Sequence, residues 1–228
     1  MTGPLDILSR CDTPTISNAL NMLRGKTTEG YTRGRPVATE PGAAPVAGYA
    51  ITMRIVTSEA PRLSEAALRD IRYAHYRAVA AAPRPAIVVV QDIGTEPGAG
   101  ALWGEVNVSV HRGLGVSGVL TDGAVRDLDA LGTGLPILAG HVRVSSAQAH
   151  IVEIGVPVTV FGLAVAPGAL LHMDRHGAHT IPPDLLPHLP AAVAALLARE
   201  RAIIDLTRDP DFDAETLIRT WEKMSAAH

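Results

Sequence analysis

The chain has 228 residues, of which 47% are hydrophobic and 19% are charged, so its composition is that of a globular protein and not of a disordered one. The net charge is −3 and no basic stripe stands out, which argues against nucleic acid as a ligand. The single cysteine, Cys11, excludes an intrachain disulfide framework and a zinc site built from several cysteines.

The first part of the chain predicts two helices and two strands around a long loop. Leu5 and Leu8 recur at helical spacing, and Asp-Thr-Pro-Thr at 12–15 is a good helix start. The Gly-, Pro- and Thr-rich segment 25–45 is typical of a loop, and the β-branched run from residue 86 is typical of a strand buried on both faces. The expected elements are a helix over 16–23, a strand over 46–56, a helix over 64–82 and a strand over 86–90.

The middle of the chain alternates between strands and helices. We expect a helix over 105–112, a strand over 115–121, a helical turn over 124–131 and a strand over 135–139. With the strand over 86–90, this order is typical of a parallel sheet with crossover helices. The pattern therefore predicts an α/β fold.

Beyond residue 140 the pattern changes to short strands separated by Gly and Pro. Residues 154–173 contain no Asp, Glu, Lys or Arg, and this uncharged stretch is long enough to span a membrane. Gly and Pro residues, however, divide it into pieces of strand length. The chain also starts without a signal-peptide pattern, so we expect a cytoplasmic protein with no membrane contact. The expected strands cover 141–145, 156–161, 163–165 and 170–172.

Two helices are expected at the end of the chain. Residues 190–206 are apolar and Ala-rich, with Pro190 in the first turn, where proline is tolerated. Residues 209–228 carry a second helical pattern. No internal repeat and no long linker interrupts the sequence, so we expect one domain over 1–206 and a helical tail over 207–228.

Two glycine-containing turns are the strongest candidates for a functional site. The run 98–105, Gly-Ala-Gly-Ala-Leu-Trp-Gly-Glu, would expose unpaired backbone N–H groups at the start of a helix, which favours an anion. A second turn follows the strand over 115–121 at the same sheet edge and leads to Arg126 and Asp127. Arg126 can clamp a carboxylate and Asp127 can hold a hard cation. Taken alone, such a pair is more often a surface ion pair, and a single Gly-rich turn is usually only a turn.

Together these segments resemble the signature of the RraA-like superfamily, which is named after the regulator of ribonuclease E activity. That group includes the class II 4-hydroxy-4-methyl-2-oxoglutarate/4-carboxy-4-hydroxy-2-oxoadipate aldolases. The resemblance lies in 101–106 and 115–127, and it extends to 12–20, 162–168 and 174–177. It implies an α/β/β sandwich similar to the swivelling phosphohistidine domain, here with a C-terminal helical extension. It also implies a homotrimer or homohexamer with active sites between subunits.

The resemblance implies a role for each residue of the site. Arg126 would hold the carboxylate or carbonyl oxygen of the substrate, and Asp127 would bind the divalent metal, Mg²⁺ or Mn²⁺. Glu105 stands where the aldolases have Asp, a difference that bears on the substrate more than on the site. The C-terminal helix of an adjacent subunit would supply Glu200, although a surface charge on that helix is an equal alternative. Backbone groups would bind the pyruvyl portion of the substrate at Gly104, Glu105, Val106 and Asn107.

The implied activity is that of a metal-dependent lyase that cleaves 2-oxo acids and releases pyruvate. A cation chelated by the 2-oxo acid would stabilise the developing enolate, and the same chemistry would permit oxaloacetate decarboxylation. The two lysines, Lys26 and Lys223, lie far from the motif in sequence, which argues against a Schiff-base aldolase. The alternative is a non-enzymatic binding protein like the ribonuclease E regulator, which is shorter and lacks the C-terminal extension. A methyltransferase has little support, because no Gly-x-Gly-x-Gly loop follows a strand.

The histidines form a rival site. His172, His176 and His179 crowd one segment with Asp174, although residues 174–177 fit a turn better than a metal cluster. On one strand, His172 and Asp174 would share a face and His179 would point the other way. Four further residues are expected to be structural or inert. We expect His150 to lie in the core and Trp103 to act as packing, although Trp103 could instead form the wall of a pocket. Cys11 has no histidine partner and Ser145 has no nucleophile-elbow context, so neither is expected to act as a nucleophile.

Overall fold

Four parallel strands form the centre of the main sheet in the computed structural model, which describes residues 5–34 and 36–226. They lie in the order β7 (Ile137–Ala139), β5 (Val116–Thr121), β3 (Ala86–Asp92) and β2 (Val46–Val56). The sheet continues antiparallel at both sides, through β1 (Val37–Ala38) next to β7, and through β12 (Leu170–Asp174) and β13 (Gly177–Thr180) beyond β2. The parallel layer that the alternation of strands and helices predicted is therefore confirmed.

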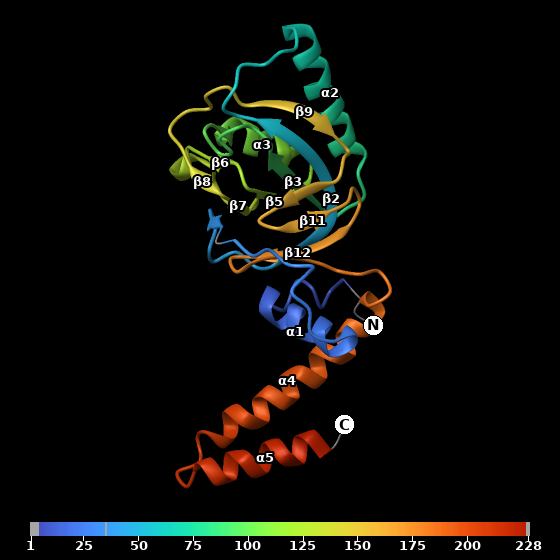
Figure 1. Ribbon diagram of the computed structural model, residues 1–228, viewed down its shortest axis with the longest axis vertical. Helices are drawn as coiled ribbons and strands as arrows, with labels where there is room; N and C mark the ends of the chain where they lie inside the picture. Colours follow the sequence, from blue (N-terminus) through green and yellow to red (C-terminus); the bar gives the residue numbers. More distant parts are fainter. Residues whose placement is uncertain (1–4, 35, 227–228) are drawn as a thin grey trace.

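The long strand β2 curls this sheet because it pairs with three different strands along its length. Its first residues pair with β12, its middle with β3, and its last residues with β9 (His150–Ile154). The register of the β2–β9 pair shifts between Arg54 and Ile55, and Figure 1 shows β2 bending around the body of the molecule. Shifts of this kind increase the local bend of a strand.

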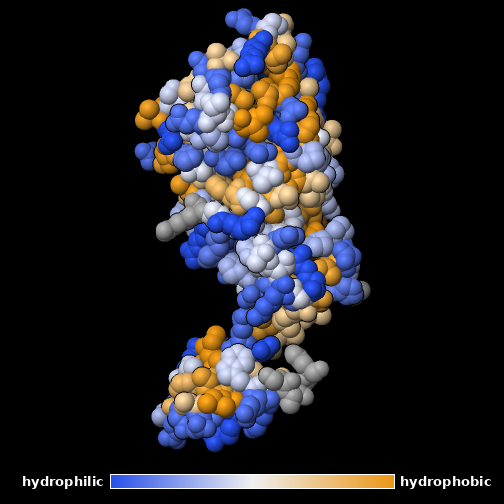
Figure 2. Space-filling model, in the orientation of Figure 1, coloured by the Kyte–Doolittle hydropathy of each residue, from blue (hydrophilic) through white to orange (hydrophobic). Residues whose placement is uncertain are grey.

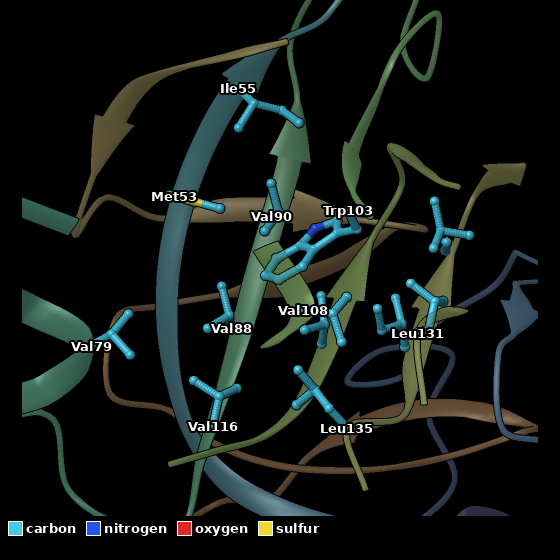
Figure 3. Packing of buried hydrophobic residues seen from close by; sticks show 14 of the residues in the cluster. Met53, Ile55, Val79, Val88, Val90, Trp103, Val108, Val116, Leu131 and Leu135 are labelled. Atoms are coloured by element: carbon cyan, nitrogen blue, oxygen red, sulfur yellow. The ribbon is translucent and has the colours of Figure 1, made fainter. Parts of the chain in front are cut away.

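Two smaller sheets and two helices cover the faces of the main sheet. The hairpin of β10 (Val158–Val160) and β11 (Leu163–Val165) packs with Ile87 and Val89 of β3. The opposite face, with Val88 and Val90, packs against β4 (Ala101–Trp103), α2 (Glu65–Ala81) and α3 (Glu105–Gly113), as Figure 3 shows. Strand β3 is thus buried on both faces, as its sequence predicted. The parallel strands β4, β6 (Ala124–Val125) and β8 (His141–Val142) form the third sheet.

Three helices gather at the end of the molecule where β12 lies. They are α1 (Thr13–Arg24), α4 (Leu189–Leu206) and α5 (Ala214–Ala226). A separate apolar cluster, apart from those on the two faces of the main sheet, joins Leu20 of α1 to Val193 and Leu196 of α4. The rest of α4 and all of α5 extend away from the sheets as an arm (Figure 1). Among the described residues, no helix is long and apolar enough to cross a bilayer.

The structure corrects the sequence interpretation at several short elements. The helical turn expected over 124–131 is instead β6, followed by a 3₁₀ turn at Leu128–Ala130. The backbone N–H of Arg126 donates to the carbonyl of Trp103 (2.8 Å), so this segment joins a strand ladder before it can turn. The sequence pattern did not predict β1, which lies inside the expected loop, or the strands β4, β9 (His150–Ile154) and β13.

Candidate active site

Gly104 brings the two predicted turns together. It is the N-cap of α3, with an extended backbone (φ −140°, ψ −178°) that any residue can adopt. A side chain is excluded for another reason, because a Cβ at this position would lie 2.6 Å from Asp127 Oδ2 and 3.0 Å from Arg126 Nε. Glycine is therefore required by the close approach of the Arg126–Asp127 turn to the start of α3.

The backbone fixes Arg126 and Asp127 at this position. Strand β6 pairs in parallel with β4, which sets Arg126 beside the end of Trp103. Asp127 then adopts the left-handed conformation (φ 58°, ψ 39°), which Asp and Asn tolerate better than most residues. Its carbonyl accepts the N–H of Ala130 at 2.8 Å, which closes the turn. The carboxylate points back to α3, where Oδ2 accepts the N–H of Glu105 at 3.2 Å.

The site combines donors for an anion with a carboxylate. Arg126 Nε lies 3.7 Å from Asp127 Oδ2, and the two side chains are 40% and 37% exposed. Arg126 Nε is buried and has no hydrogen-bond partner among the described residues. The first backbone bond within α3 runs from Val108 N to Gly104 O, so the N–H groups of Val106 and Asn107 lie in the unpaired first turn of the helix. An anionic group of a small molecule can therefore be held here.

The oxygen donors of the site fit a hard divalent cation. The Asp127 carboxylate contacts the backbone N–H of Glu105, whose side chain is exposed at the start of α3, and carboxylate oxygens are ligands that Mg²⁺ and Mn²⁺ accept. Within residues 5–34 and 36–226, no group of three or more His, Cys, Asp or Glu side chains is placed to hold a metal. The Asp127 carboxylate is the oxygen ligand fixed at this point, which suits an ion that keeps several waters.

Two of the predicted site residues have other contacts in this chain. The Asn107 side chain donates to the carbonyl of Leu102 (3.2 Å), so only its backbone N–H faces the site. Glu200 lies on α4, where it lines a cleft with Trp221 at the opposite end of the molecule from α3 (Figure 1). Glu200 could reach an Arg126–Asp127 site only from another copy of the chain, and that arrangement stays a prediction.

The rival histidine cluster is structural. His172 is fully buried, with Nδ1 3.0 Å from the Thr13 hydroxyl and Nε2 2.7 Å from the carbonyl of Leu8, so it anchors the start of α1. Residues 175–176 form the loop of the β12–β13 hairpin, which confirms the predicted turn. The expectation that His179 points away from His172 was wrong, because the two are direct cross-strand partners and such pairs share a face. Burial is the main cause that lowers the pKa of His179 to about 4.

The remaining residues from the sequence interpretation also have assigned places. Trp103 is fully buried in the cluster of Figure 3, so it acts as packing and not as an exposed pocket wall. Cys11 is buried, and desolvation followed by the nearby Asp12 charge raises the pKa of its thiol, which disfavours a nucleophilic thiolate. His150 was expected in the core but is half-buried at the edge of a cavity, where its Nδ1 lies 2.7 Å from the carbonyl of Gln148.

Sequence reasoning missed a buried histidine pair behind the site. His75 of α2 and His111 of α3 are both 1% exposed, and their Nε2 atoms lie 2.9 Å apart. Burial lowers the pKa of both rings, that of His75 to about 4. The two residues are separated by 36 positions, and only the packing of α2 beside α3 brings them together. Their one sequence signal was that each lies on the apolar side of its helix.

Comparison with known proteins identifies the family. A model described as "RraA-like: Aldolase/RraA" matches residues 13–179. A Halalkalibacterium halodurans protein named "Putative 4-hydroxy-4-methyl-2-oxoglutarate aldolase" is 32% identical over 111 residues, which are 46% of this chain and 53% of that protein. The match thus spans about half the length of that relative.

Two solved structures share the fold. An uncharacterized protein from Pseudomonas syringae pv. tomato str. DC3000 has a TM-score of 0.70 at 21% identity, over 96% of this chain and 93% of its own. Streptomyces coelicolor RraAS2, described as an unusual member of the RNase ES inhibitor RraA protein family, has a TM-score of 0.66 at 23% identity, over 90% and 95% of the two chains. Since the family model matches more than half of the chain, the protein belongs to the RraA-like family of aldolases and RraA proteins.

Proposed function

We propose that this protein is a divalent-metal-dependent carbon–carbon lyase that releases pyruvate from 2-oxo acids. The observation that carries the proposal is the contact at Gly104, where Arg126, Asp127 and the first turn of α3 converge. A cation-binding carboxylate beside donors for an anion is the arrangement that a chelating 2-oxo acid requires. Membership of a family that includes aldolases, and the name of the Halalkalibacterium relative, support the same chemistry.

Each residue of the site has a defined task in this reaction. The unpaired N–H groups of Val106 and Asn107 and the guanidinium of Arg126 would bind and orient the carboxylate and the 2-oxo oxygen. Asp127, with Glu105 beside it, would hold the cation, which supplies Lewis-acid stabilisation of the enolate when bound. These fixed donors need no rearrangement as negative charge develops on the substrate.

Retro-aldol cleavage fits this geometry for a 4-hydroxy-2-oxo acid. The bond between C3 and C4 breaks, its electron pair remains on C3 as the pyruvate enolate, and the 4-hydroxyl loses a proton as C4 becomes a carbonyl. A proton delivered to C3 then completes pyruvate. Loss of CO₂ from oxaloacetate would leave the same enolate, so the same donors would serve both reactions. Glu105 has one methylene more than the Asp of related aldolases, a difference that bears on which 2-oxo acid is the substrate.

The second candidate is a non-enzymatic binding protein. The Streptomyces neighbour is described as a member of an RNase inhibitor family, and its likeness covers 90% of this chain. The RNA-processing inhibitor RraA from Thermus covers only 73% of this chain, with a TM-score of 0.53, so the extra length separates this chain from that inhibitor but not from the Streptomyces protein.

A substrate panel separates the two functions. Oxaloacetate and several 4-hydroxy-2-oxo acids are incubated with the full chain in Mg²⁺ or Mn²⁺, and pyruvate is measured with a coupled lactate dehydrogenase reaction. Pyruvate release that exceeds the rate measured with the same metal but without protein, stops on addition of a chelator and returns with metal supports the lyase. Failure of every acid to yield pyruvate, with metal present and the protein folded, overturns the lyase proposal and supports a binding protein.

A further inference from the structure

A cavity of about 350 Å³ lies between α2, α3 and the segment that leads into β9. Its volume is at the lower end of the range for small-molecule sites. Side chains at helical spacing line it, Leu68, Arg72 and Tyr76 from α2 and Asn107 and His111 from α3. Figure 2 shows apolar surface gathered at the upper end of the molecule, where α2 and β9 lie.

Hydrogen bonding fixes the tautomers of the histidine pair that lines this cavity. The carbonyl of Asn107 can only accept, so His111 Nδ1, 2.7 Å away, must donate to it. In the neutral ring His111 Nε2 is then an acceptor, and His75 Nε2 must donate to it across 2.9 Å. His75 Nδ1 is left as an acceptor, and it is buried with no hydrogen-bond partner among the described residues. A ligand with a hydroxyl or N–H group would satisfy it.

The charge of the cavity selects an anionic ligand. Arg72 is exposed at its mouth, and no acidic side chain is among the described residues that line it. Burial keeps His75 and His111 neutral at physiological pH, and Arg72 is the permanently charged side chain among the described residues of the lining. Ala147, on the opposite wall, has a left-handed backbone (φ 44°) that a side chain rarely adopts, and strained residues of this kind concentrate at binding sites.

We propose that this cavity is a second ligand site, which binds a small organic acid with an apolar body and a hydroxyl group. Arg72 binds the carboxylate, the apolar lining holds the body, and the hydroxyl donates to His75 Nδ1. Arg126 and Asp127 do not line the cavity, which adjoins the candidate active site at Asn107 and is otherwise lined by other residues. The proposal does not depend on lyase activity.

Calorimetric titration with 4-hydroxybenzoate tests the site, because this probe carries a carboxylate, an apolar ring and a hydroxyl donor. Benzoate and 4-methoxybenzoate are the matched probes, one smaller and one larger, and both lack the donor. Arg72→Gln removes the charge at the cavity mouth. Arg69→Gln is its control on the same helix, since Arg69 is outside the lining and lies 3.9 Å from Asp70. Arg126→Gln reports on the other site.

We expect 4-hydroxybenzoate to bind with about fivefold higher affinity than either matched probe, the value of one hydrogen bond. Arg72→Gln should weaken its binding roughly threefold to tenfold, while Arg69→Gln and Arg126→Gln leave it unchanged. Three results would overturn the proposal: no binding at millimolar concentrations, equal affinity for the three probes, or loss of binding in Arg126→Gln but not in Arg72→Gln. The last result would assign the probe to the candidate active site.

Discussion

Substitution of Gly104 by alanine tests whether the contact at the start of α3 holds the site together. The added Cβ would lie 2.6 Å from Asp127 Oδ2, and ordinary contact begins at 3.4 Å, so the carboxylate must move by about 0.8 Å. A misplacement near 1 Å can cost roughly 10²-fold in rate, so we expect kcat/KM for pyruvate release to fall by about that factor. The backbone conformation of Gly104 suits alanine, and the fold should survive.

Thermal melting and a control on the same helix separate this effect from loss of stability. Alanine is a poor N-cap, which costs up to about 1 kcal/mol and lowers Tm by roughly 2–4 °C in a chain of this size. Gly113→Ala lies in the last turn of α3, where an added methyl would have no neighbour within 4 Å, so it should leave activity unchanged. Normal kcat/KM in folded Gly104→Ala would refute the reasoning, because Asp127 would then have moved without consequence.

Four further predictions concern two substitutions, the oligomeric state and the pH dependence of stability. Arg126→Lys should mainly raise KM in steady-state assays, because an ammonium cannot form the two-pronged contact of a guanidinium. Asp127→Asn should keep the fold, since Asn tolerates a backbone φ of 58°. The variant should bind metal more weakly in calorimetric titration, and its kcat should fall roughly 10²–10³-fold. Normal metal binding together with a lowered melting temperature would exclude Asp127 as a metal ligand. Sedimentation should show a closed homo-oligomer, and a fully active monomer would contradict this. Urea unfolding should show a loss of stability as pH falls from about 6.5 to about 4. Burial lowers the pKa of His75 and His179 to about 4, so in that window the unfolded chain takes up protons that the folded chain does not. Asp122, whose pKa burial raises to about 6, offsets part of this loss, and equal stability at pH 7 and 4.5 would show that the histidines are not buried in solution.

The sequence predicted the elements whose apolar residues repeat over several turns or a full strand. Strand β2 begins and ends at the predicted residues, and α3 begins at Glu105 as expected. The short strands β4 and β6 were missed because two or three residues are too few to show a period, and β4 and β6 pair with each other across about twenty residues of sequence. The adjacency of Arg126 to the start of α3 was still predicted, because both follow strands that end at one edge.

The candidate site was predicted in part for the same reason. The spacing of two turns indicated that Asp127 and Glu105 would meet, but it gave no sign that a missing Cβ at Gly104 makes the contact possible. The His75–His111 pair had no local pattern at all, because it arises where two helices pack side by side. Contacts between helices depend on the packing of the whole core, which a periodic pattern in one segment does not specify.

The arm of α4 and α5 carries Glu200 away from the Arg126–Asp127 site of its own chain. All four buried residues of α4 lie in its first half, from Leu189 to Leu196, so Glu200 projects beyond the part that the body holds. Past that point the arm exposes large apolar side chains, with Leu197 45%, Ile204 49% and Ile218 48% accessible. Burial of such surface in a neighbouring copy would stabilise an assembly by about 25 cal/mol for each Å² removed from water. Assembly would then bring Glu200, on the second half of α4, to the site of a neighbouring copy. Activity that depends on Glu200 should therefore decline on dilution as the assembly dissociates.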